Sequence, residues 1–116
     1  MISIYGIKTC NSVRKAIKFC KDHDLEFIFI DFRVTPLDCN KIDYFISKSD
    51  INILFNNRGT KYRDLKLKDL NLTDTQKATW LCKENMLLKR PILEYNGNII
   101  VSFNKEDYIE KLINSL

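Results

Sequence analysis

The beginning of the sequence constrains the fold most, because it reads as a strand, a helix and a second strand in close succession. Residues 2–7 are rich in Ile, and residues 25–32 are dense in Phe and Ile. Between them, residues 12–22 place apolar side chains at helical spacing. Two neighbouring strands joined by one crossover helix run parallel in a sheet. We therefore expect a βαβ unit, with residues 25–32 as a buried strand.

The end of the chain predicts a hairpin followed by a helix. Asn96-Gly97 separates the β-prone runs 92–95 and 98–101, and Asn-Gly between such runs is the strongest short-range hairpin signal. Asn104 can then serve as the N-cap of a last helix. Two further strands should thus complete the sheet.

The residues between these two patterns predict helices. Thr35-Pro36 offers an N-cap followed by a proline at the first helical position, and a further helix begins at Thr73. The predicted fold is α/β and thioredoxin-like: a mixed four-stranded sheet flanked by helices, with a helical insertion. At 116 residues we expect a single domain, residues 1–116.

The charge of the chain excludes some classes of partner. A net charge of +4 is too small to indicate DNA binding by itself. The excess of positive charge is local. Residues 8–21 hold five basic side chains and no acidic one, and residues 56–68 hold five basic side chains and one acidic one, Asp64. Such segments can attract a small anion. No apolar run is long enough to span a membrane and the N-terminus lacks a secretory signal, so we expect a cytoplasmic protein that binds no membrane.

The four cysteines lie at positions 10, 20, 39 and 82, and no pair has C-x-x-C spacing. With His23 as the only histidine, we expect no metal site, no disulfide framework and four free thiols. Cys20 and Cys82 fall on apolar helical stripes and are predicted to be packing residues. Cys39 lies in the first turn of the second predicted helix.

Cys10 is the cysteine best placed to react. It lies in the turn between the first strand and the first helix, where unpaired backbone N–H groups and the helix dipole favour the thiolate. Lys8 and Arg14 add positive charge, and we expect both to favour ionisation further. A thiolate in this position can serve as the nucleophile of an oxidoreductase or a thiol transferase.

Two arginines stand next to residues that turn the backbone. Arg58 precedes Gly59, and Arg90 precedes Pro91. A guanidinium held by such a turn can present its planar fork to an oxyanion or a carboxylate. We therefore regard Arg58 and Arg90 as candidate anion-binding residues.

Three stretches carry a family resemblance: residues 4–16 (IYGIKTCNSVRKA), 57–65 (NRGTKYRDL) and 89–93 (KRPIL). Together they resemble the arsenate-reductase-like (ArsC/Spx/YffB) family of the thioredoxin-like superfamily, and most closely its YffB-like branch. The resemblance implies that Cys10 is the single catalytic nucleophile and that Arg58 and Arg90 bind an oxyanion or glutathione. It also implies that Pro91 is a structural cis-proline beside the active site.

The family resemblance implies a glutathione-dependent thiol oxidoreductase or reductase. Such an enzyme binds no cofactor and takes its electrons from glutathione, often with glutaredoxin as a partner. Its substrate would be small and anionic, or would carry a thiol. We expect a monomer.

Two departures from the family pattern keep alternative functions open. The arsenate reductases use a third arginine shortly after the hairpin, where this chain has Ser102 and Phe103. The Spx regulators use a C-x-x-C switch, whose second position is here Val13. The alternatives are a genuine arsenate reductase that uses glutathione and glutaredoxin, or an Spx-like regulator that binds RNA polymerase without such a switch.

Overall fold

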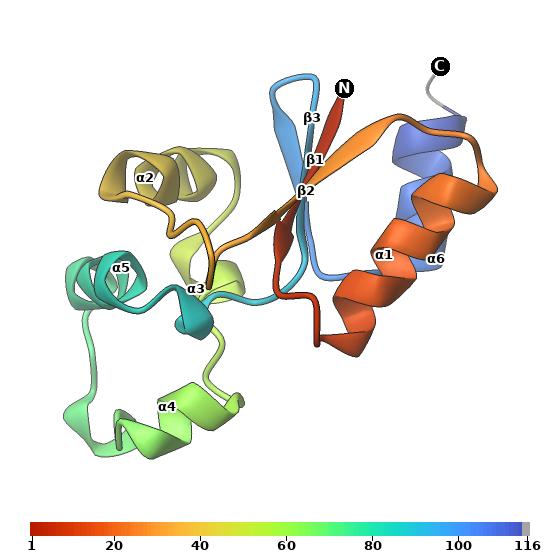
Figure 1. Ribbon diagram of the computed structural model, residues 1–116. Helices are drawn as coiled ribbons and strands as arrows, with labels where there is room; N and C mark the ends of the chain where they lie inside the picture. Colours follow the sequence, from red (N-terminus) through yellow and green to blue (C-terminus); the bar gives the residue numbers. More distant parts are fainter. Residues whose placement is uncertain (115–116) are drawn as a thin grey trace. The chain divides into compact units, whose positions relative to one another are not determined.

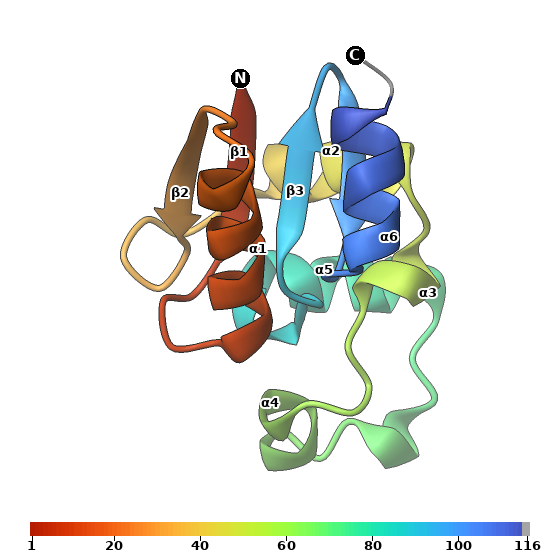
Figure 2. The same ribbon diagram turned by 90° about the vertical axis from the view of Figure 1, so that its right-hand side faces the viewer.

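The computed structural model describes residues 1–114 and contains a four-stranded sheet with the order β2-β1-β3-β4 (Figure 1). The strands are β1 (Ile2–Gly6), β2 (Phe27–Asp31), β3 (Ile92–Tyr95) and β4 (Asn98–Val101). Antiparallel pairing joins β1 to β3 and β3 to β4. In Figure 2, β1 and β2 run in the same direction. The sheet is therefore mixed, and the predicted thioredoxin-like α/β fold is confirmed.

Six α-helices accompany the sheet in the described part of the chain. They are α1 (Asn11–Asp22), α2 (Cys39–Lys48), α3 (Ile51–Leu54), α4 (Thr60–Asp64), α5 (Asp74–Lys83) and α6 (Lys105–Tyr108). Short 3-10 turns lie at Lys68–Leu70 and Asn85–Leu87, and α6 continues into a π-helical turn at Ile109–Ile113.

The chain forms two compact units. The first, here called the sheet unit, comprises residues 1–30 and the chain from Arg90 onward, and it contains α1 and α6. The second, the helical unit, comprises Asp31–Lys89 and contains α2 to α5. The helical unit corresponds to the insertion that the sequence predicts.

The core of the sheet unit lies between the sheet and the helices α1 and α6, which cover the same face (Figure 1, Figure 2). Its buried members are Ile2, Ile4, Ala16, Phe19, Cys20, Leu93, Ile100, Tyr108 and Leu112. Helix α1 approaches strand β1 closely at Gly6. A Cβ atom at this position would lie 2.5 Å from Cγ2 of Val13. Glycine at this position therefore allows α1 to begin directly against β1.

Local capping explains where several helices begin. Thr73 forms a capping box with Gln76, as expected for a helix that starts there. Asn104 accepts a hydrogen bond from the backbone N–H of Asp107 at 3.0 Å. Asn96 and Gly97 both have positive φ, which the predicted hairpin turn requires.

Two expectations from the sequence are wrong. The second helix does not begin at Thr35-Pro36; its N-cap is Asp38, whose carboxylate accepts from the N–H of Lys41 at 2.8 Å. The strand β2 is not buried, since Ile28 is 47% exposed. This strand lies at the edge of the sheet, so its apolar composition reflects contact on one side only.

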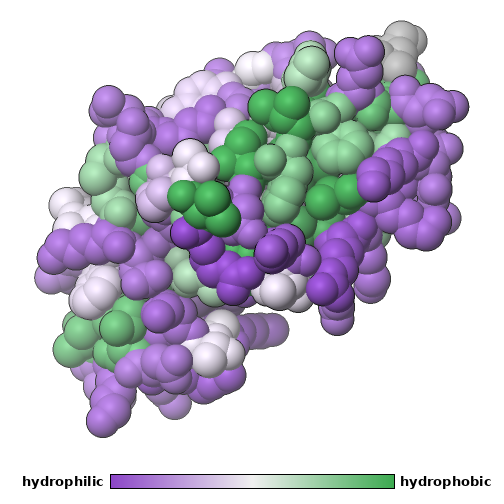
Figure 3. Space-filling model, in the orientation of Figure 1, coloured by the Kyte–Doolittle hydropathy of each residue, from purple (hydrophilic) through white to green (hydrophobic). Residues whose placement is uncertain are grey.

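Large apolar side chains that face solvent are scattered along the described chain: Met1, Ile28, Val34, Ile53, Leu65 and Leu70. Hydrophilic side chains border the face drawn in Figure 3, with apolar ones between them. None of the helices within residues 1–114 combines the length and apolar character needed to cross a lipid bilayer.

Candidate active site

Cys10 is the N-cap of α1 and is partly exposed. Its backbone is extended (φ −82°, ψ 126°), and its carbonyl oxygen accepts from the N–H of Arg14 at 3.1 Å. Its own N–H donates to the carbonyl of Ile7 at 3.2 Å, which closes the turn after β1. Cys10 directly precedes the first helical turn, whose N–H groups have no partner within the helix. Its side chain makes no capping hydrogen bond to them. The positive end of the dipole of this 12-residue helix lies at Cys10.

Arg14 is tied to the same turn. Its Nε donates to the backbone carbonyl of Lys8 at 3.1 Å, so the guanidinium spans the turn that contains Cys10. The side chains of Lys8 and Arg14 are both exposed. The structure therefore places the two predicted basic residues on either side of the cysteine, with Arg14 held in position by a hydrogen bond.

Arg90 and Pro91 lie at the same end of the sheet as this turn. The register pairs Tyr5 with Ile92 in antiparallel strands, so the end of β1 lies beside the start of β3. The Arg90–Pro91 peptide bond is cis, as the resemblance implies. Pro91 is buried, and its carbonyl accepts from the N–H of Ser102 at 2.8 Å. Arg90 is half-buried.

Arg58 belongs to the helical unit, in the segment just before α4. It lines a cavity of about 590 Å³ together with three further basic side chains, Arg63, Lys66 and Lys68. Arg63 donates from Nη1 to the carbonyl of Arg58 at 2.9 Å, and so secures the loop. The cavity has a single acidic residue, Asp69, and its chemistry suits an anion. That Arg58 acts together with Cys10 stays a prediction.

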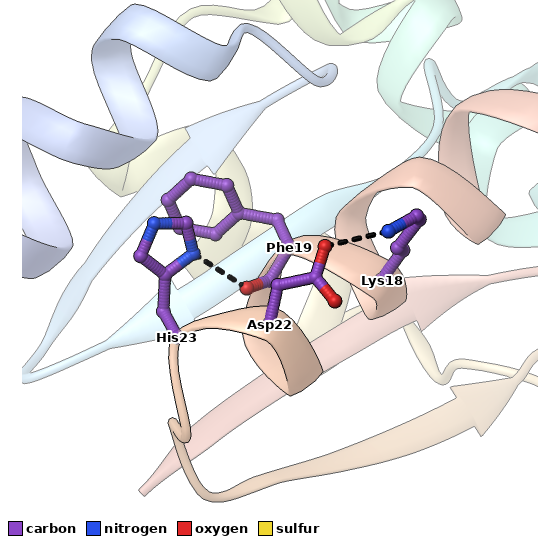
Figure 4. Close-up of polar contacts among 4 residues, drawn as sticks. All are labelled: Lys18, Phe19, Asp22 and His23. Carbon is purple, nitrogen blue, oxygen red and sulfur yellow. Dashed lines mark hydrogen bonds and ion pairs between the residues drawn. The ribbon is translucent and has the colours of Figure 1, made fainter.

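The only histidine lies at the opposite end of α1 from Cys10. His23 stacks on Phe19 and its Nδ1 lies 2.9 Å from the Phe19 carbonyl, next to the ion pair of Lys18 with Asp22 (Figure 4). A helix of this length spans roughly 18 Å. His23 therefore cannot serve as a general base for Cys10.

Two of the other thiols have raised pKa values. Burial raises the pKa of Cys20 to about 11, so this thiol is un-ionised at neutral pH and packs in the core as predicted. The pKa of Cys82 is raised to about 12, first by burial and then by a hydrogen bond with Cys39 and the charges of Asp43 and Asp38. The sequence gives no signal for the contact between Cys39 and Cys82, because a contact between two helices leaves no local pattern. Within residues 1–114, no group of three or more potential ligands could hold a metal ion.

Comparison with known proteins identifies relatives along nearly the whole chain. The model of the ArsC family matches residues 5–111. An uncharacterized protein of Haemophilus influenzae is 37% identical over 109 residues, which cover 93% of this chain and 96% of the relative. The global transcriptional regulator Spx 1 of Lactococcus lactis is 23% identical over 109 residues. This match covers 92% of this chain and 85% of the regulator.

Solved structures show the same architecture. A YffB protein superposes with a TM-score of 0.89 at 24% identity, covering 97% of this chain and 99% of its own. An arsenate reductase (ArsC) related protein from Brucella melitensis has a TM-score of 0.75 at 28% identity. The match covers 97% of this chain and 94% of the Brucella chain. These relatives share the fold, while they include both an arsenate-reductase-related protein and a transcriptional regulator.

Proposed function

Because the chain belongs to the ArsC family, we propose that it is a thiol oxidoreductase with Cys10 as its only nucleophile and glutathione as its co-substrate. The observation that carries the proposal is the position of Cys10 as the N-cap of α1, with Arg14 tied across the same turn. We place the reaction in the cytoplasm, where the glutathione pool keeps thiols reduced.

The reaction needs two thiol–disulfide exchanges. The Cys10 thiolate attacks the glutathione sulfur of a mixed disulfide, forms a new S–S bond and releases the substrate thiolate. A second glutathione thiolate then attacks the same glutathione sulfur. Oxidised glutathione leaves and the Cys10 thiolate is regenerated, so one disulfide is reduced and one is formed. Arg58 and Arg90 would bind the carboxylates of glutathione or an anionic substrate.

We propose that glutathione supplies the resolving thiol, because the sheet unit offers no second reactive cysteine. The residue three positions after Cys10 is Val13, which is completely buried, and Gly6 lies close to it. The other cysteine of the sheet unit is Cys20, whose burial and raised pKa keep it inert. An internal disulfide of the C-x-x-C kind is therefore ruled out by the sequence at this turn.

The test is a coupled assay with a glutathione mixed disulfide of a small thiol, in which oxidised glutathione is reduced by glutathione reductase and NADPH. We expect turnover that falls to the uncatalysed rate in Cys10→Ser and is retained in Cys20→Ser, a matched control at an inert thiol. Arg90→Gln should raise KM for glutathione more than it lowers kcat. Equal turnover by wild type and Cys10→Ser would refute the mechanism.

Arsenate reduction is the first alternative. The similarity to the arsenate reductase (ArsC) related protein of Brucella melitensis favours it. The segment after the hairpin carries Ser102 and Phe103 instead of an arginine. We expect little turnover with arsenate, glutathione and glutaredoxin, because one guanidinium fewer is available for the oxyanion. Robust turnover in that assay would replace the proposed substrate by arsenate.

Binding to RNA polymerase is the second alternative, suggested by the similarity to the Spx 1 regulator. A pull-down with purified RNA polymerase separates the two functions. Binding that persists in Cys10→Ser, without thiol turnover in the wild type, would favour a regulator.

A further inference from the structure

Two cysteines that the proposed reaction does not use lie side by side in the helical unit. Cys39 is the first residue of α2, and Cys82 lies in the last turn of α5. The two helices pack against each other (Figure 1, Figure 2). The backbone N–H of Leu37 donates to Oδ1 of Asn85 at 2.8 Å, which ties the chain just before α2 to the chain just after α5. The Cys39 thiol is also near enough to contribute to the raised pKa of Cys82. We propose that Cys39 and Cys82 form a redox-active dithiol that a peroxide converts reversibly into an intramolecular disulfide.

The exposure of the two thiols sets the order of the reaction. Cys39 is exposed and Cys82 only partly so, so a peroxide reaches Cys39 first. Cys82 meanwhile remains protonated at neutral pH, because burial and the charges of Asp43 and Asp38 disfavour its thiolate. Cys39 is therefore the thiol that reacts with the oxidant, and Cys82 is the thiol that resolves the sulfenic acid.

The chemistry balances with hydrogen peroxide as the oxidant. The Cys39 sulfur attacks one peroxide oxygen, the O–O bond breaks, and a sulfenic acid and one water form. The Cys82 sulfur then attacks the sulfenic sulfur, the S–O bond breaks, and the departing hydroxyl leaves with the Cys82 proton as a second water. Two thiols are oxidised and one peroxide is reduced to two waters. A reducing dithiol reverses the change by exchange.

The disulfide would close a covalent loop inside the helical unit. All residues that line the basic cavity, from Asn57 to Asp69, lie between Cys39 and Cys82 in the sequence. An S–S bond between these residues would tie the start of α2 covalently to the end of α5. Oxidation would therefore restrain the segment that carries Arg58.

Peptide mapping of the wild-type protein tests the proposal directly. Dilute protein is treated with two equivalents of hydrogen peroxide, enough for Cys10 and for the pair, then alkylated and digested with trypsin, which releases Cys39 in residues 34–41 and Cys82 in residues 78–83. We expect these peptides to be joined, with the mass of two hydrogen atoms lost, and separated again by dithiothreitol. Cys10→Ser should give the same link, which separates this outcome from the fate of the proposed enzyme activity.

Variants of the pair add a second readout. Cys82→Ser should stop the reaction at the Cys39 sulfenic acid, which dimedone captures, while the matched control Cys20→Ser should form the Cys39–Cys82 link normally. The proposal is overturned if the wild type shows no such link, whether Cys39 stays reduced, forms a sulfinic acid, or pairs with another cysteine or a second chain.

Discussion

At the residue scale, the reactivity of the thiols follows from the backbone positions that hold them. Cys10 is the N-cap of α1, and Nε of Arg14 in the first turn donates to the Lys8 carbonyl. We predict that Arg14→Gln slows alkylation of Cys10 by iodoacetamide at pH 7 about 2–5-fold, the effect of one charge near a helix end. Lys15→Gln is the matched control, since Lys15 is an exposed cation one position further along. Equal rates in both variants would show that Arg14 does not act on the thiol.

Tyr108 presents a different residue-scale problem, a hydroxyl buried without a hydrogen-bond partner in the described structure. Desolvation of such a group costs free energy that no bond offsets. We predict that Tyr108→Phe raises the free energy of unfolding by about 1 kcal/mol. Tyr108→Ala should lower it by about 3–5 kcal/mol, because it opens a cavity. Urea denaturation measures both, and a loss in Tyr108→Phe would reveal a partner for the hydroxyl.

At the scale of elements, mutations can locate the start of α2, which the sequence predicts at Thr35-Pro36 and the structure places after Asp38. Asp38 caps this helix, whereas Thr35 lies outside it. Asp38→Ala should therefore lower the free energy of unfolding by about 1 kcal/mol. Thr35→Ala is the matched control and should change it by less than about 0.5 kcal/mol. A larger loss from Thr35→Ala would restore the helix start expected from Thr35-Pro36.

The close approach of α1 to β1 gives a prediction that links two elements. A methyl group at Gly6 would meet Cγ2 of Val13 at 2.5 Å. We predict that Gly6→Ala destabilises the protein by about 1–3 kcal/mol. In a Val13→Ala background the same change should cost at least about 0.5 kcal/mol less, because the colliding methyl is absent. Additive effects in this double-mutant cycle would contradict the contact.

The elements that the sequence predicts well are those encoded by neighbouring residues. The Asn96-Gly97 turn, the Thr73 capping box and the Cys10 turn each depend on a few adjacent side chains. The errors concern non-local facts: β2 looks buried by composition but lies at the sheet edge, and this depends on strand order. The Cys39–Cys82 contact likewise depends on how two helices pack.

At the scale of the whole molecule, buried thiols should make stability depend on alkaline pH. The pKa of Cys20 is raised by burial from 9.0 to about 11, and burial also raises the pKa of Tyr108. Between pH 9 and pH 11 the unfolded chain has therefore lost a proton from Cys20 that the folded chain still holds. Since the unfolded state then binds fewer protons, the free energy of unfolding falls as pH rises.

Urea denaturation at pH 8, 9, 10 and 11 measures this dependence. We predict that the free energy of unfolding of the wild type declines through this range, and that Cys20→Ala declines less steeply. The slopes are the informative quantity, because removal of the buried Cys20 side chain also lowers stability at every pH. Tyr108→Phe should flatten only the part above about pH 10, where an exposed tyrosine ionises. A Cys20→Ala slope equal to that of the wild type would mean that Cys20 ionises alike in both states, and would contradict the conclusion that burial keeps this thiol inert.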